Sequence, residues 1–368
     1  MPIVKTLSKA TKLEKEKFTI PKSVQDAIPI QRIWPDGIFQ IGSRFSKTFS
    51  FTDINYSIAG KEDKTAMFLD YSEFLNALDS GASAKITINN RRINKAEFES
   101  SLLLPMKEDG LDHFRKEYNE MLLSKVSGTN NSVVQDRYIT VTVAKRNIDE
   151  ARTYFSRVGT DLITHLSQLS SICRELDAET RLRVFRDFFK SNEPAAFPFN
   201  LKEQMKKGHS FKDWLCPDSM EFQKDHFRLN DRWGRVLYLQ GYASYIKDSM
   251  IAELCDMDRS LMLSIDILPV PTDEAVQEIQ NKLLGVETNA ANWQRKQNAA
   301  RNFSAVLPYD MEQQRKETTE MLEDLTNRDQ RMMYGLVTLV HLADTKEQLD
   351  SDTETILTTA RKLSLIHI

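Results

Sequence analysis

The run Tyr138-Ile139-Thr140-Val141-Thr142-Val143-Ala144-Lys145-Arg146-Asn147-Ile148-Asp149-Glu150 combines two local patterns. Apolar and polar side chains alternate up to Ala144, which predicts a β-strand with Ile139, Val141 and Val143 on one face. Asn147, with Glu150 three residues later, is typical of a capping box at the start of a helix. The stretch therefore predicts a strand that leads directly into a capped helix.

The same arrangement is repeated farther along the chain. Met332 to Leu342 is apolar on both faces, as in a central strand, and a helix is predicted after Asp344, with Glu347 three residues on. Each junction is preceded by the pattern strand, helix, strand, helix. We therefore expect an α+β fold made of two tandem ferredoxin-like βαβαβ lobes, side by side, with long amphipathic helices.

The elements of the first unit are predicted from the spacing of its apolar residues. Its strands are expected over 45–53 and 84–89, and its helices over 62–79 and 111–126. The helix that Asn147 caps carries an apolar stripe that continues to Leu176. Such a stripe fits a helix lying on a sheet; a coiled coil is the alternative interpretation.

The second unit is predicted in the same way. Its elements are a hairpin around Asp231-Arg232-Trp233-Gly234, a short helix over 245–255, a strand over 261–268, and a helical pattern from Thr272 to about 327 with a break near Pro308. The predicted division of the chain is an extended basic lead-in (1–35), a first α+β lobe (36–177), a bridge (178–225), a second α+β lobe (226–362) and an atypical tail (363–368).

The composition is that of an ordinary globular protein. The 368 residues carry a net charge of −3, so the molecule as a whole has no built-in attraction for nucleic acid or anionic lipid. The three cysteines (Cys173, Cys216 and Cys255) are far apart, which indicates a reducing cytoplasm rather than a disulfide framework. No apolar run approaches the ~20 residues of a transmembrane helix, and the first residues lack the apolar core of a signal peptide.

The sequence contains none of the common nucleotide-binding or catalytic motifs. A phosphate-binding loop requires Gly-x-x-x-x-Gly-Lys-Ser/Thr. The one Gly-Lys pair, Gly60-Lys61, is followed by Glu62 and has Asn55 in place of the first glycine. No two glycines are spaced as in a dinucleotide site, and neither a Gly-x-Ser-x-Gly elbow nor a His-Glu-x-x-His helix occurs. We therefore predict no catalytic, cofactor-binding or metal-ligating residue in this chain.

One group of side chains in and beside the bridge has the chemistry of a metal site. Zinc binds histidine, cysteine and carboxylate groups, and this part of the chain contains His209, Asp213, Cys216, Asp218, Asp225 and His226. Their spacing matches no standard zinc finger or knuckle, so we interpret them as ordinary surface or loop residues. The histidines of the predicted helices and strands (His113, His165 and His341) are interpreted as packing or surface residues.

Two basic clusters raise the question of nucleic-acid binding, because phosphate contacts depend on such charges. One is Arg91-Arg92 with Lys95, and the other is a helix with Arg181, Arg183, Arg186 and Lys190. Acidic residues lie among them and no ladder of aromatic side chains accompanies them, so each is predicted to be a solvated face. The lysine-rich lead-in is also interpreted as solvated; weak contact with lipid headgroups or a partner is the alternative.

Several long strings of residues carry a resemblance to a known family. They include Trp34-Pro35-Asp36-Gly37-Ile38-Phe39 and Pro269-Val270-Pro271-Thr272-Asp273-Glu274-Ala275, with further strings at 28–30, 51–56, 86–92, 175–179, 245–250 and 308–316. The chain resembles, over about residues 20 to 362, the N-terminal region of the conjugal-transfer ATPases of type IV secretion systems. These form the TraE, TrbE and CagE-like family, and the likeness is to the branch on integrative conjugative elements of Gram-positive bacteria.

The resemblance implies a docking role for this chain. In that family the region precedes a RecA-like motor domain, which binds ATP with magnesium and powers conjugative DNA transfer and pilus assembly. No ATP-binding residue of the motor has a counterpart here. The implied partners are inner-membrane components of a type IV secretion complex, with self-association of the full-length protein. The implied location is cytoplasmic, peripheral at the inner face of the cell membrane, and strong direct nucleic-acid binding is not expected.

Alternatives stay open for the tail and for the function. The last six residues, Leu363-Ser364-Leu365-Ile366-His367-Ile368, do not continue the resemblance. We interpret the chain as a truncated reading frame with an artefactual tail; a genuine divergent C-terminus is the alternative.

For the function, one alternative is a stand-alone nucleic-acid-binding accessory protein of a conjugative element, whose affinity for DNA would fall steeply with salt. Another is a small enzyme whose site is built from scattered residues.

Overall fold

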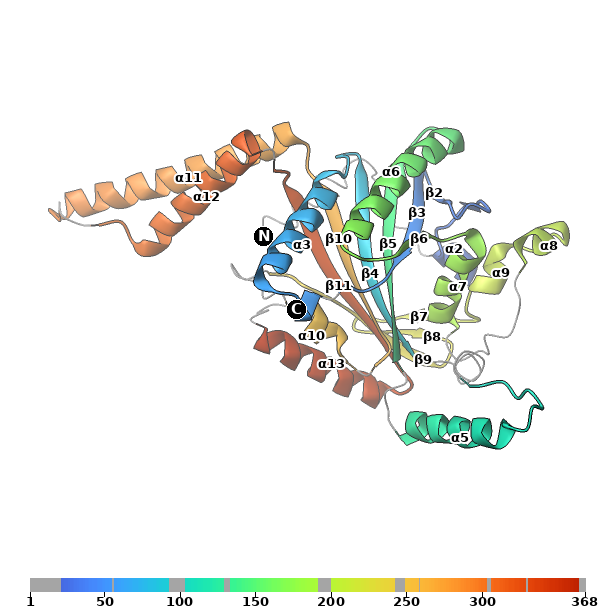
Figure 1. The fold of residues 1–368 in the computed structure, drawn as a ribbon. Coiled ribbons are helices and arrows are strands. Elements are labelled where there is room, and N and C mark those ends of the chain that lie inside the picture. Colours follow the sequence, from blue (N-terminus) through green and yellow to red (C-terminus); the bar gives the residue numbers. More distant parts are fainter. Residues whose placement is uncertain are drawn as a thin grey trace.

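The computed structural model describes residues 21–54, 56–92, 103–128, 133–190, 200–241, 249–257, 259–302, 306–328 and 330–363. Helices and one large antiparallel sheet form a mixed α+β fold, which confirms the predicted class at that level (Figure 1). The strands are β1 (Arg32–Ile33), β2 (Phe39–Ile41), β3 (Arg44–Phe51), β4 (Ala82–Arg92), β5 (Val133–Ala144), β6 (Cys173–Glu175), β7 (Met220–Phe222), β8 (Phe227–Leu229), β9 (Arg232–Tyr238), β10 (Leu261–Pro269) and β11 (Met333–Ala343).

The strands follow the order β1–β2–β3–β5–β4–β10–β11–β9–β8–β7 across the sheet, and β6 pairs with β3. The helices are α2 (Val24–Ala27), the 3-10 helix η2 (Tyr56–Ile58), α3 (Lys61–Asn76), α5 (Asp112–Gly128), α6 (Ile148–Gln168), α7 (Ala178–Phe189), α8 (Leu201–Lys206), α9 (Phe211–Leu215), α10 (Met250–Cys255), α11 (Thr272–Ala299), α12 (Tyr309–Asn327) and α13 (Lys346–Lys362). The predicted helical pattern from Thr272 with a break near Pro308 is therefore confirmed as α11 and α12.

The strand–helix junction at 138–150 forms as predicted. β5 ends at Ala144 and α6 begins at Ile148. The backbone N–H of Glu150 donates to Asn147 Oδ1 over 2.9 Å. The Glu150 carboxylate accepts a bond of 3.4 Å from the backbone N–H of Arg146 and not from that of Asn147, so only half of the capping box is made.

The prediction of one helix with a stripe that reaches Leu176 is wrong. α6 ends at Gln168, and Ser170 adopts a left-handed backbone with φ +61°. The N–H of Ser171 donates to the carbonyl of Leu166 over 2.8 Å, which closes the helix end. The chain then returns along β3 as β6. Cys173 packs against the core under α6 from this strand, which is why its spacing imitates a helical period.

The hairpin of the second unit turns earlier than predicted. Leu229 of β8 pairs with Arg232 of β9, so Asn230 and Asp231 form the turn. Asn230 has φ +53°, a conformation that asparagine tolerates, whereas Gly234 lies within β9. Of the predicted helix over 245–255, α10 is the described part; residues 242–248 lie outside the described residues.

Two parts of the chain share one order of elements. The first runs β3, α3, β4, α5, β5, α6, and the second runs β9, α10, β10, α11 with α12, β11, α13. In each part the third strand lies between the first and the second, as β3–β5–β4 and β9–β11–β10. β4 and β10 pair antiparallel from Ala84↔Ile267 to Asn90↔Leu261. The two parts therefore form one continuous sheet.

The shared sheet presents one apolar face to its helices. Partnered residues run across the strands from Phe49 through Ile139, Ile86 and Ile265 to Val337, which places their side chains in one row. α3 and α6 cover the first part of this face, and α10 and α13 cover the second (Figure 1). Burial of each large apolar side chain in this core contributes roughly 1.5–3 kcal/mol to stability.

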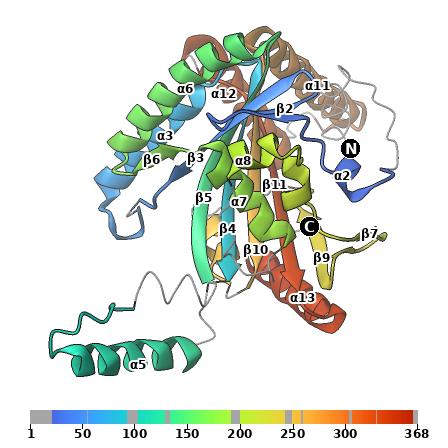
Figure 2. The same ribbon diagram turned by 90° about the vertical axis from the view of Figure 1, so that its right-hand side faces the viewer.

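The predicted bridge packs at one end of the sheet. α7, α8 and α9 enclose a small core with Ile28, Phe39, Leu182 and Leu215 among its members. Figure 2 shows α7 and α8 on a different side of the sheet from α3 and α6. Residues 24–33 of the predicted lead-in join this core through α2 and β1. Residues 1–20, which hold most of the lead-in lysines, lie outside the described residues.

Two helical segments extend away from the sheet. α11 and α12 lie along each other as a long hairpin on one side (Figure 1). α5 lies below the opposite end of the sheet and stands apart from it in both views (Figures 1 and 2). Both segments connect the second and third strands of their own part of the chain.

Candidate functional site

α5 and the residues before it form a small folded arm. The Asp112 carboxylate accepts two backbone N–H groups of the preceding turn, over 3.0 and 2.9 Å, and Arg115 bridges Asp109 and Asp112. The side-chain amide of Asn119 exchanges two hydrogen bonds of 2.9 Å with the backbone of Leu104. Hydrogen bonding to Arg115 lowers the pKa of Asp109 to about 2, so this carboxylate is charged at neutral pH.

The arm carries an exposed apolar face. Leu111, Phe114, Tyr118 and Met121 are 52%, 58%, 47% and 42% exposed. Their spacing of three, four and three residues places them on one side of the helix. An apolar face of this kind is typical of a surface that binds a partner.

The α11–α12 hairpin has a packed base and exposed apolar residues farther out. Ile279 and Leu325 lie in a core at the base, and the Tyr334 hydroxyl of β11 donates to a carboxylate of α11 over 2.5 Å. Leu284 and Tyr309 are 66% and 76% exposed. The hairpin is therefore anchored to the sheet at one end and offers apolar side chains to solvent elsewhere.

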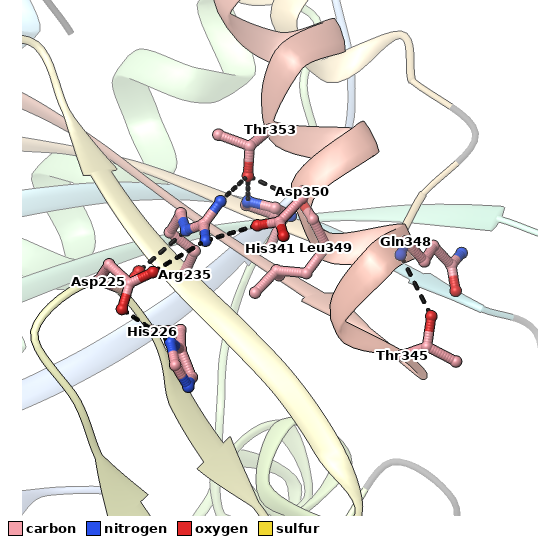
Figure 3. Close-up of polar contacts among 9 residues, drawn as sticks. All are labelled: Asp225, His226, Arg235, His341, Thr345, Gln348, Leu349, Asp350 and Thr353. Atoms are coloured by element: carbon pink, nitrogen blue, oxygen red, sulfur yellow. Dashed lines mark hydrogen bonds and ion pairs between the residues drawn. The ribbon is translucent and has the colours of Figure 1, made fainter.

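The side chains tested for a metal site do not converge. His209 and Asp218 are exposed, Cys216 is buried in the bridge core, and His226 lies 2.9 Å from Asp225 through Nδ1 and Oδ1 (Figure 3). In the part of the chain that the structure describes, no group of three or more His, Cys, Asp or Glu side chains is placed to hold a metal ion.

Beside that histidine, a polar network ties α13 to the sheet (Figure 3). Arg235 of β9 donates to Thr353 Oγ1 and Asp350 Oδ1 over 2.8 Å each, and to the backbone carbonyl of Asp225 over 2.9 Å. Thr353 Oγ1 also lies 3.1 Å from Nε2 of the buried His341. Burial, and then the charges of two neighbouring arginines, lower the pKa of His341 to about 4.

The donors and acceptors of this network set the state of His341. Thr353 Oγ1 donates its one proton to the carbonyl of Leu349 over 2.7 Å, so it accepts from both Arg235 and His341. The neutral imidazole then carries its proton on Nε2, while Nδ1 is buried with no hydrogen-bond partner among the described residues. Arg235, His341 and Thr353 are joined through the Thr353 hydroxyl, and these contacts hold α13 against the sheet. His341 is thus buried between the sheet and α13, the first of the two settings, packing or surface, that the sequence predicts for it.

Three arginines of the two basic clusters, Arg91, Arg181 and Arg186, are engaged by the protein itself. Arg91 pairs with a carboxylate of β5 over 2.6 Å, while the side chains of Arg92 and Lys95 lie outside the described residues. In α7, Arg186 stacks over an indole ring at 4.7 Å from its centre. Arg181 is buried, so the prediction of a solvated face is wrong for this residue. Its side chain lies on the face of α7 that packs against the sheet, where backbone carbonyls accept its hydrogen bonds.

Sequence reasoning missed both the exposed face of α5 and the Arg235 network. The apolar spacing of the α5 helix was visible, but its exposure depends on where the helix lies.

No described helix is both long enough and apolar enough to cross a membrane. Comparison of the sequence with protein-family models finds no match, and comparison with curated proteins finds none either.

Proposed function

We propose that this chain is the non-catalytic docking and assembly region of a conjugal-transfer ATPase of a type IV secretion system. The observation that carries the proposal is the projecting arm of α5, whose apolar face is open to solvent. The α11–α12 hairpin and the residue strings that resemble this family support the same role. ATP and magnesium would be bound by the motor domain of the full-length protein, and not by residues of this chain.

We also infer that the two parts of the sheet are ferredoxin-like lobes. The order β6–β3–β5–β4 supports this for the first lobe, because it puts the four strands in the spatial order fourth, first, third, second. The second lobe repeats that order for its first three strands, β9, β10 and β11. α5 and the α11–α12 hairpin then occupy equivalent places in the two lobes, so each lobe would contribute one docking arm.

The proposed partners are inner-membrane components of the secretion complex and further copies of the full-length protein. Residues 104–121 contain five acidic and three basic side chains, and such an arm favours a protein partner over an anionic lipid surface. The chain would therefore be cytoplasmic and held at the inner face of the membrane through protein contacts.

Co-purification tests this proposal. The tagged chain is co-expressed with each inner-membrane subunit of a type IV secretion system in turn, and the amount of retained subunit is measured. We expect the parent chain to retain at least one subunit. The double variant Phe114→Asp/Tyr118→Asp should lose it, because two charges on the apolar face of α5 oppose burial in an interface.

The matched control is Phe68→Asp, since Phe68 of α3 is an aromatic residue of similar exposure, 64%, outside the arm. It should retain the subunit. Retention by the α5 variant, or retention of no subunit by the parent chain, contradicts the proposal, as does ATP hydrolysis by the purified chain. DNA binding that weakens steeply with salt would favour the nucleic-acid-binding alternative.

A further inference from the structure

A cavity of about 750 Å³ lies between α7, the β7–β8 hairpin and one face of the sheet. Its walls are mostly apolar and include Phe185 and Phe189 of α7, Phe222 of β7, Val236 of β9 and Val340 of β11. Phe222 and Val236 are 68% and 52% exposed, so the cavity is open to solvent. Its size and its lining are those of a site for a small, largely apolar molecule.

One buried cation, Arg181, lines the same cavity. It is 4% exposed. Its guanidinium donates to the carbonyls of Gly37 and Ser46 over 2.9 and 2.7 Å and to Ser46 Oγ over 2.8 Å. The group also lies 4.0 Å from the centre of the Phe39 ring. Among the described residues, Nε has no hydrogen-bond partner and no carboxylate forms an ion pair with Arg181.

The missing counter-charge has an energetic consequence. A buried charge is costly unless it is paired, and carbonyl dipoles with an aromatic face offset only part of that cost. Burial lowers the pKa of Arg181 to about 9, so the guanidinium remains charged at neutral pH. An anion that entered the cavity would supply the missing charge where the surroundings screen it weakly.

We propose that this cavity binds an amphipathic alkyl carboxylate of the fatty-acid class, with its chain against Phe185, Phe222 and Val236 and its carboxylate at Arg181. The apolar walls select the alkyl chain, and the unpaired guanidinium selects an anionic head group. An alcohol of the same chain length lacks the charge, and an alkylammonium ion would place a second cation beside Arg181. The inference does not depend on the docking role proposed above.

Calorimetric titration of the full chain with three probes tests the ligand class. Dodecanoate, dodecanol and dodecyltrimethylammonium have the same number of carbon atoms in their main chain and differ in charge. The two ions are used below their critical micelle concentrations and dodecanol below its solubility limit. We expect dodecanoate to bind at least tenfold more tightly than dodecanol and the cation to show no saturable binding. Absence of dodecanoate binding, or equal affinity for all three probes, overturns the proposal.

Three variants test the location. Val236→Asp adds a carboxylate at a half-exposed wall position and should weaken dodecanoate binding at least tenfold. Leu284→Asp changes a residue that is 66% exposed on α11, outside the cavity, and should keep the parent affinity. Arg181→Met should reduce dodecanoate affinity to that of dodecanol. If circular dichroism shows that Arg181→Met does not fold, the first two variants decide, and equal dodecanoate affinities in them overturn the proposal.

Discussion

Single side chains hold together parts of this molecule that are far apart in the sequence. Arg235 of β9 donates to Asp350 and Thr353 of α13. The Thr353 hydroxyl also accepts a hydrogen bond from His341 and donates one to the carbonyl of Leu349. These groups lie at the boundary between the sheet and the helix that covers it. A buried donor without an acceptor costs more than an ordinary hydrogen bond contributes, so one hydroxyl influences the stability of the whole contact.

Thr353→Val tests this because it keeps the shape of the side chain and removes the hydroxyl. The N–H groups of Arg235 and His341 would lose their shared acceptor, and we expect the free energy of unfolding to fall by ~1–3 kcal/mol in urea denaturation. Thr355→Val, on the exposed side of the same helix, should change it by no more than about 0.5 kcal/mol. Equal losses in the two variants would contradict the role of the network.

His341 also makes stability depend on pH. Its pKa is about 4 in the folded protein and ~6.5 in an unfolded chain, so between these values the unfolded state binds more protons. Stability is therefore full above pH ~6.5 and falls as the pH drops toward 4, by up to about 3 kcal/mol. Urea denaturation at pH 7 and pH 5 should show the loss.

His341→Gln should reduce this pH dependence, because the side chain no longer titrates. His113→Gln, on the exposed side of α5, should leave it as in the parent chain. An unchanged pH dependence in His341→Gln would show that other groups are responsible.

Among the elements, α6 and β3 approach each other closely at one glycine. A Cβ atom on Gly159 would lie 2.8 Å from Glu175 Oε1 and 3.2 Å from a ring carbon of Phe49. Gly285 is also inside a helix, α11, yet a Cβ atom there would meet nothing within 4 Å. Close packing therefore favours glycine at position 159, whereas position 285 has room for a side chain.

The substitution to alanine should have opposite effects at these two sites. Gly159→Ala should lower the free energy of unfolding by ~1–3 kcal/mol, because α6 or Phe49 must move. Gly285→Ala should raise it by about 0.5–1 kcal/mol, because alanine favours a helix where space is free. Thermal or urea unfolding measures both, and a stabilised Gly159→Ala would show that α6 does not lie this close to β3.

For the whole molecule, the β4–β10 ladder makes the two parts of the chain one sheet. Residues 84–90 pair with residues 261–267, so backbone hydrogen bonds and the row of apolar side chains continue from one part to the other. α5 and the α11–α12 hairpin stand outside this shared core. The arms can therefore be altered with little effect on the sheet, whereas each half of the sheet supports the other.

This continuity predicts that the two halves unfold together. Trp34 packs beside Phe45 in the first half, and Trp233 lies in β9 of the second. In two versions of the chain, each retaining one of these tryptophans with the others replaced by Phe, fluorescence should report the same urea midpoint. Two separate midpoints would show that the halves are independent domains.

Local patterns predicted many of the helices and strands. The alternation before Ala144 and the cap at Asn147 each involve residues within a few positions of one another, so a short stretch of sequence contains the information. The end of α6 was missed because the left-handed turn is made by Ser170, where glycine is the usual signal. The hairpin turn was predicted at Asp231–Gly234 and lies at Asn230–Asp231, because several neighbouring residues suit a turn.

The amino-acid sequence was sufficient for the class of the fold and for the absence of a phosphate-binding loop from these residues, because both depend on neighbours along the chain. It was not sufficient for the strand order, for the burial of Arg181 or for the exposed face of α5. Those features depend on contacts between residues more than 100 positions apart, such as Arg181 with Ser46, or on where a helix lies relative to the sheet. A helical pattern shows which residues share a face, whereas only packing in three dimensions settles what that face meets.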